Sequence, residues 1–180
     1  MAILGLCGSL RRDSHNRQLL HALGAALPPG LRLEIFEGLA AIPPYDEDLS
    51  SPPAVLALRE AIASADAVVV ATPEYNSSLP GQLKNALDWA SRPFPDNALR
   101  DKPVAVVGAS TGLFGAVWAQ AELRKVLGAI GARVVDAELP VGQAGHAFDD
   151  NGGLIDPALR QTLEEIVSEL ITKIGLEACC

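Results

Sequence analysis

The sequence contains few of the residues that form metal sites, disulfide frameworks or aromatic clusters. Its 180 residues include three cysteines, three histidines and 4% aromatic residues. The cysteines are too few and too scattered for a disulfide framework, and His15, His21 and His146 lack the spacing of metal ligands, so we expect no metal. No apolar run approaches the roughly 18 residues of a membrane span. Cys7 ends an apolar stretch, which predicts a buried, inert thiol.

The charge and the order of the N-terminal residues predict a cytoplasmic protein that binds neither nucleic acid nor a membrane. The net charge of −8 disfavours both of those anionic partners. The apolar stretch Met1–Cys7 precedes Arg11 and Arg12, whereas a signal peptide places its basic residues first. Residues 176–180 are predicted to be a C-terminal tail. An inert tail is favoured over a redox or arsenic-binding role for its adjacent Cys179 and Cys180.

Apolar stretches alternate with helical patterns along the whole chain. Strands are predicted at 2–7, 31–36, 67–71, 103–108 and from 132–135, with helices from about 16, at about 54–64, at 80–91, from 115 to about 127, and at 157–173. Short connections between alternating strands and helices predict one doubly wound parallel α/β domain over residues 1–175, with helices on both faces. Five strands suit the flavodoxin-like order 2-1-3-4-5 better than a six-stranded Rossmann sheet.

Three polar loops, rich in glycine or hydroxyl groups, follow the first, third and fourth predicted strands. They are Gly8–Asn16, Thr72–Ser78 and Ala109–Gly115. In the predicted strand order all three emerge at the carboxyl edge of the sheet, where open α/β sheets bind their ligands. We therefore expect the three loops to form one binding site.

The first loop has the composition of a phosphate site. It runs into a helix, whose first N–H groups and macrodipole favour an anion. Ser9 and Ser14 add hydroxyl groups, Asn16 an amide and Arg11 a planar charged fork. Alternatively, Ser14 merely caps the helix and the arginine is solvated. Neither a Walker pattern nor Gly-x-Gly-x-x-Gly is present, which favours a monophosphate over a nucleoside triphosphate or a Rossmann-bound dinucleotide.

The second and third loops offer groups that suit a flat heterocycle. In the second loop, backbone amides together with Tyr75 and Asn76 could bind the polar edge of such a ring; the alternative is a turn and a helix cap with Tyr75 on the surface. The third loop would let backbone approach a ring closely, although a strand-to-helix turn often needs glycine anyway. Its candidate residues are Ser110, Thr111, Gly112 and Gly115.

Two motifs in these loops resemble the NADPH-dependent FMN reductase family of flavodoxin-like proteins, which includes bacterial quinone and chromate reductases. The first motif is Gly8-Ser9-x-Arg11-x-x-Ser14-x-Asn16. The second is Pro73-Glu74-Tyr75-Asn76, followed by Ser78-x-Pro80-Gly81-x-Leu83-Lys84-Asn85-Ala86-x-Asp88-Trp89. Shorter matches to the family pattern within residues 148–156 extend the resemblance almost to the C-terminus. Trp118 departs from the family pattern, because many relatives have a small or basic residue there.

The resemblance implies a set of cofactor-binding residues but no catalytic acid, base or nucleophile. The FMN phosphate would be held by Ser9, Arg11, Ser14 and Asn16. The isoalloxazine ring would contact Pro73, Glu74, Tyr75 and Asn76, with Ser110, Thr111, Gly112 and Gly115 along its other side. The flavin itself would carry the chemistry, so the protein would only hold and tune it.

The same resemblance implies an NAD(P)H-dependent oxidoreductase. A hydride would pass from NADPH or NADH to FMN and on to a quinone, free flavin, an azo compound or a chromate-like oxidant, with ping-pong kinetics. Relatives of this kind form homodimers or homotetramers. Two alternatives remain, a flavodoxin-like one-electron carrier and a flavodoxin-like protein without a cofactor.

Overall fold

The computed structural model of the protein describes residues 1–175, so the predicted tail with Cys179 and Cys180 lies outside the described residues. A parallel sheet has the strand order β2-β1-β3-β4-β5, which confirms the predicted flavodoxin-like order. Its strands are β1 (Ala2–Cys7), β2 (Arg32–Ile35), β3 (Ala67–Thr72), β4 (Pro103–Ala109), β5 (Arg133–Val134) and β6 (Leu139–Val141). The central strands β3 and β4 are buried along their whole length.

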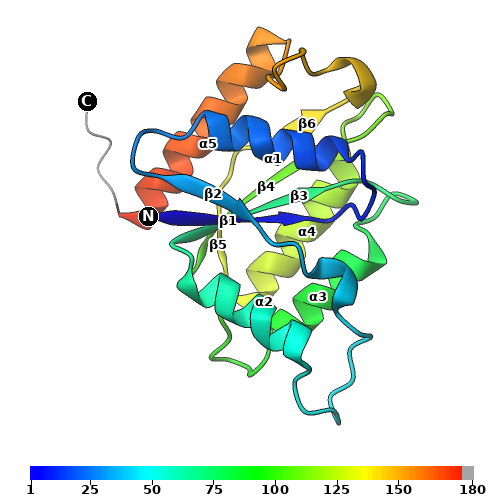
Figure 1. Ribbon diagram of the computed structural model, residues 1–180, viewed down its shortest axis with the longest axis vertical. Helices are drawn as coiled ribbons and strands as arrows, with labels where there is room; N and C mark the ends of the chain where they lie inside the picture. The colour runs from blue at the N-terminus through cyan, green and yellow to red at the C-terminus, as the bar shows by residue number, and fades with distance from the viewer. Residues whose placement is uncertain (176–180) are drawn as a thin grey trace.

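Helices cover both faces of the sheet, as predicted (Figure 1). On one face lie α1 (His15–Ala25) and α5 (Pro157–Ile174); on the other lie α2 (Pro53–Ser64), α3 (Gly81–Ala90) and α4 (Val117–Ile130). Two short 3-10 turns, η1 (Leu39–Ala41) and η2 (Ala144–His146), complete the elements. Within residues 1–175, no helix combines the length and the apolar character that crossing a bilayer requires.

Alternation of side chains along β3 explains why its sequence is apolar at every position. Val68 and Val70 pack in the core cluster beneath α2, α3 and α4, whereas Val69 and Ala71 pack in the cluster beneath α1 and α5. Successive side chains of a strand point to opposite faces, so a strand covered on both faces needs an unbroken apolar run. The loops after β1, β3 and β4 leave this sheet at the right-hand edge in Figure 1.

The fifth predicted strand is divided in two, which the sequence analysis missed. β5 pairs with the start of β4, β6 pairs with its end, and residues 136–138 leave the ladder between them. The guanidinium group of Arg124 in α4 stabilises this connecting segment by donating hydrogen bonds to the carbonyl oxygens of Asp136 (3.0 Å) and Ala137 (3.4 Å). Pro140 is tolerated within β6 because a strand at the sheet edge can lack one ladder N–H.

Candidate active site at the carboxyl edge of the sheet

The first loop ends in a helix start with free backbone donors. Ser14 is the N-cap of α1, and its Oγ accepts a hydrogen bond from the N–H of Arg17 at 3.3 Å. The N–H groups of His15 and Asn16 have no hydrogen-bond acceptor within the helix, because the first N–H groups of an α-helix are left unpaired. Ser14 is therefore the helix cap that was considered as an alternative, and the two N–H groups that follow it still suit an anion.

Asn16 has a structural role that sequence reasoning did not anticipate. Its side chain is 2% exposed, and its Nδ2 donates to the carbonyl oxygen of Ala109 at 2.9 Å. The N–H of Ala109 donates back to Oδ1, also at 2.9 Å. Both ends of the amide thus join the start of α1 to the end of β4. Because the side chain is committed to this pair, a ligand in the first loop meets the backbone N–H of Asn16 rather than a free amide.

The second loop contains a tight turn with two left-handed residues. The N–H of Tyr75 donates to the carbonyl of Ser78 at 3.0 Å, and the reverse bond is 3.2 Å. Between them, Asn76 has φ = 53° and Ser77 has φ = 60°, which is the geometry of a type I′ turn. The Tyr75 side chain is 48% exposed, so its ring is available at the edge of the site.

Glu74 fastens the second loop to the start of α4. One carboxylate oxygen, Oε2, accepts hydrogen bonds from the N–H groups of Trp118 (3.1 Å) and Ala119 (3.2 Å). The residue at the N-cap of α4, Ala116, has φ = 61° and no side chain that could cap the helix. Glu74 therefore caps α4 from another segment of the chain, and its negative charge lies at the positive end of the helix.

Packing between loops, rather than a ligand, accounts for one of the predicted glycines. Gly115 has φ = 58°, and a Cβ placed on it would lie 2.3 Å from the carbonyl carbon of Pro140 in β6. No side chain fits at that distance. The third loop is further fixed by the N–H of Ser110, which donates to the carbonyl of Val141 at 3.0 Å. Gly115 is thus required by the close approach of its own backbone to β6.

A cleft of about 90 Å³ at this edge is lined by residues of all three loops. It brings together nine of the twelve predicted cofactor-binding residues, namely Ser9, Arg11, Ser14, Asn16, Pro73, Glu74, Tyr75, Ser110 and Thr111. The other three, Asn76, Gly112 and Gly115, are not among its lining residues. His15 and Ala109 line the cleft but were not predicted, although both flank predicted residues directly.

The chemistry of the cleft suits a phosphate group. Its donors are the exposed guanidinium of Arg11, the first N–H groups of α1 and the hydroxyls of Ser9 and Ser14. Its carboxylate, that of Glu74, is already engaged by two N–H groups of α4. The cleft is small, so a group of the size of a phosphate suits it and larger parts of a ligand would extend beyond it.

The chain is similar to known proteins over almost its whole length. The NAD(P)H-dependent FMN reductase of Pseudomonas aeruginosa is 42% identical, over 93% of this chain and 92% of that protein. The 2-hydroxy-1,4-benzoquinone reductase of a Burkholderia species is 37% identical over 94% and 93%. Among solved structures, FerB of Paracoccus denitrificans, a flavoenzyme NAD(P)H:(acceptor) oxidoreductase, superposes with a TM-score of 0.85 and 35% identity, over 97% of each chain. Residues 1–146 match the family described as NADPH-dependent FMN reductase. The chain belongs to this family, as its two loop motifs predicted.

Proposed function

We propose that the protein is an FMN-dependent oxidoreductase that takes a hydride from NADPH or NADH and passes electrons to a small-molecule acceptor. Membership of the family supports flavin-dependent oxidoreduction. The observation that carries the proposal is the convergence of nine predicted cofactor-binding residues, from loops far apart in the sequence, on one phosphate-sized cleft. Relatives named for FMN and quinone reduction favour free flavin or a quinone as acceptor, with azo compounds and chromate-like oxidants as further candidates.

Each group of residues has a defined part in this function. Bound FMN supplies the hydride-accepting chemistry, so no catalytic acid or nucleophile is needed. Arg11 and the N–H groups at the start of α1 offset the charge of the phosphate, and Ser9 and Ser14 border it. The turn at Tyr75–Ser78, held against α4 by Glu74, presents the aromatic side chain and backbone N–H groups to the ring. One open face that serves donor and acceptor in succession gives ping-pong kinetics.

An exposed apolar patch around the site supports the proposal of a homodimer or homotetramer. Large apolar side chains on the three loops and the first turn of α4 are about half exposed or more, namely Leu10, Tyr75, Leu113, Phe114 and Trp118. The rings of Phe114 and Trp118 pack edge to face with their centroids 5.2 Å apart. Clustered exposed apolar groups are characteristic of interaction surfaces. Sedimentation velocity at several protein concentrations tests this, since a monomer throughout would contradict it.

The visible spectrum of the purified protein, before and after anaerobic addition of NADPH, tests the proposed function. Flavin absorption that bleaches on addition of NADPH is the expected result. Flavin that remains oxidised with both NADPH and NADH would instead indicate an electron carrier. A protein that stays colourless after incubation with FMN would show that the three loops do not form a flavin site.

A further inference from the structure

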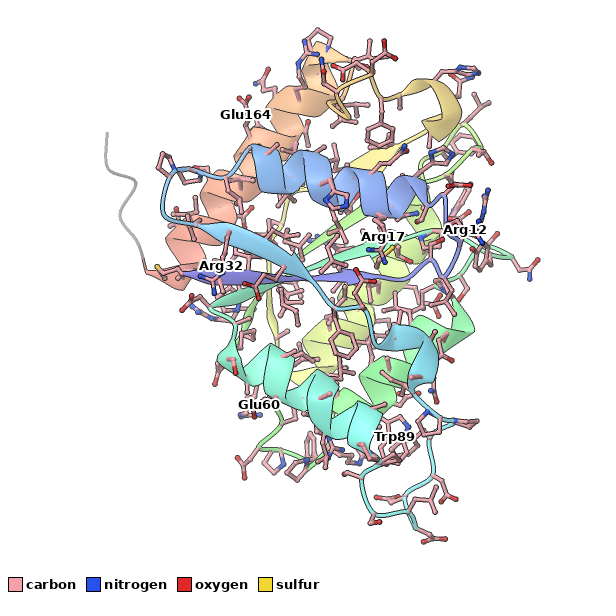
Figure 2. All side chains as sticks on the ribbon, in the orientation of Figure 1. Arg12, Arg17, Arg32, Glu60, Trp89 and Glu164 are labelled. Carbon is pink, nitrogen blue, oxygen red and sulfur yellow. The ribbon has the colours of Figure 1, made fainter. Side chains whose placement is uncertain are left out.

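Gln120 is a buried polar side chain at the start of α4 that the proposed function does not use. It is 1% exposed, and its Nε2 donates to the carbonyl oxygen of Gly115 in the third loop at 2.9 Å. α4 begins at the edge of the sheet that carries the three loops (Figure 1), the edge at which Arg12 is labelled in Figure 2. Gln120 therefore joins the first turn of this helix to the loop that precedes it.

The other end of the same amide has no partner. Within residues 1–175, no group donates a hydrogen bond to Oε1 of Gln120, although this atom is buried. A buried polar atom without a partner costs free energy, and an unbranched methionine would occupy a similar space without that cost. The contribution of Gln120 therefore lies in its Nε2 donor rather than in filling the core.

The sequence of β4 leaves the space that this amide occupies. Val104 and Val106 pack in the core cluster beneath α2, α3 and α4, and Gly108 is the next position on that face of the strand. A Cβ on Gly108 would lie 2.7 Å from Nε2 and 3.0 Å from Cδ of Gln120. Glycine at the last position of this row thus lets the amide lie against the end of β4, directly before the third loop.

Carbonyl groups of the third loop accept hydrogen bonds from outside the loop, whereas its N–H groups remain unpaired. The carbonyl oxygens of Ser110 and Gly112 accept N–H groups from the segment after β6, at 2.9 and 2.8 Å, and that of Gly115 accepts Nε2 of Gln120. In the part of the chain that the structure describes, no N–H of residues 111–116 has a backbone acceptor. Because a trans peptide points its N–H opposite to its C=O, holding each carbonyl also fixes the direction of the N–H that follows it. The loop is thus a set of oriented, unpaired donors, which suits an electron-rich group.

Gln120 holds the part of this loop whose backbone is strained. Gly115 has φ = 58° and Ala116 has φ = 61°. A non-glycine residue such as alanine adopts a left-handed backbone only where the surrounding structure imposes it. The hydrogen bond from Nε2 to the Gly115 carbonyl fixes the peptide between these two residues, and so helps to impose that conformation.

We propose that Gln120 is a positioning residue of the flavin site, which acts through the Gly115 carbonyl to orient the unpaired N–H groups of the third loop toward bound FMN. The inference rests on the proposed function. Reduction adds negative charge to the flavin ring, and fixed N–H dipoles stabilise a charge that develops beside them. Gln120 is therefore expected to strengthen the binding of reduced FMN more than that of oxidised FMN.

The test compares the dissociation constants of oxidised and reduced FMN, measured by anaerobic calorimetry on the FMN-free protein. Gln120→Met removes the donor but keeps a side chain of similar volume. We expect it to weaken the binding of reduced FMN by about threefold to tenfold, the range for one neutral hydrogen bond, and that of oxidised FMN by about twofold or less. By linkage, the reduction potential of bound FMN should become more negative.

Gly108→Ala tests the same amide without replacing it. Its Cβ would displace Nε2 from Gly115, so it should change the two dissociation constants in the same way as Gln120→Met. Combining the two substitutions should add little, because both remove one interaction.

Asn97→Leu is the matched control at the other end of α4. Asn97 is also buried, and its Nδ2 donates to the carbonyl oxygen of Ile130, the last residue of the helix, at 3.2 Å. Losing this bond should lower the melting temperature but leave the ratio of the two dissociation constants unchanged. If Asn97→Leu shifts that ratio as much as Gln120→Met does, the ratio reports stability and the inference fails.

Equal effects of Gln120→Met on the two dissociation constants, or no effect on either, would overturn the role of Gln120 while the proposed function stands. A wild type that binds FMN in neither redox state would overturn the proposed function as well. Circular dichroism spectra that match the wild type ensure that the variants are folded.

Discussion

Replacing Glu74 tests whether one carboxylate both stabilises α4 and positions the second loop. Its Oε2 accepts two N–H groups at the start of α4, at 3.1 and 3.2 Å, where the helix lacks a capping side chain of its own. Glu74→Ala removes both bonds and the charge. Glu74→Gln keeps one acceptor oxygen but removes the charge that interacts with the helix dipole. The two variants therefore separate the cap from the electrostatic contribution.

The expected size of each effect follows from measured helix caps. Losing a side-chain cap costs about 0.5–2 kcal/mol, and losing a favourable charge at a helix N-terminus costs about 0.3–1 kcal/mol. We expect Glu74→Ala to lower the free energy of unfolding by about 1–2 kcal/mol and Glu74→Gln by less than about 1 kcal/mol. For a chain of this size, about 1 kcal/mol corresponds to a fall of roughly 2–4 °C in melting temperature. Because the Tyr75–Ser78 turn loses one of its contacts with α4, FMN affinity should fall as well.

Two measurements and one control distinguish positioning from general stability. Thermal unfolding of the FMN-free protein reports the loss of the cap, and quenching of flavin fluorescence reports the FMN dissociation constant. Asp156 is the N-cap residue of α5 and accepts a hydrogen bond from the N–H of Ala158 at 2.8 Å, and it is not among the residues that line the cleft. Asp156→Ala should lower the melting temperature by a similar amount without changing FMN affinity.

The reasoning is refuted if Glu74→Ala melts at the wild-type temperature. It is also refuted if Glu74→Ala and Asp156→Ala weaken FMN binding equally, because Glu74 would then act through stability alone.

Three further variants test the other parts of the site. Arg11→Ala should weaken FMN binding by about 1.5–3 kcal/mol, the range for a charged hydrogen bond, and unchanged affinity in a fluorescence titration would disprove the phosphate assignment. Gly115→Ala should lower the free energy of urea unfolding by about 2 kcal/mol or more because of its positive φ and lack of space, whereas Gly81→Ala, with open space around it, should not. Asn16→Ala should cost about 1–3 kcal/mol in the same assay, since it leaves buried groups of Ala109 unpaired; wild-type stability would contradict that role.

The order of the strands and the convergence of the three loops on one cleft could be predicted because both depend on local patterns. A strand such as β3 must be apolar at every position when helices cover both faces, and its sequence shows this directly. The loops that follow such strands at the carboxyl edge need no further information to be placed together. For that reason nine predicted residues converge in one cleft, although they come from three separate segments.

The contacts between these segments could not be predicted, because they join residues distant in the sequence. Asn16 pairs with a residue 93 positions away, and Glu74 caps a helix that begins more than 40 positions later. Each side chain had a local interpretation, as a phosphate ligand or as a ring contact, that needed no such partner. β6 was missed for a different reason: Leu139-Pro140-Val141 is short and contains the residue that usually ends a strand.

These long-range contacts explain how three loops can act as one rigid site. Asn16 fixes the first loop to the end of β4, where the third loop begins. Glu74 fixes the second loop to the helix that follows the third, and the hydroxyl of Ser78 donates to Glu122 of the same helix at 2.5 Å. If the cofactor supplies the chemistry, the protein contributes mainly by holding these loops at fixed positions around it. The residues that matter most for that task are therefore those whose side chains point to another loop, and a search restricted to groups that could touch the cofactor misjudges them.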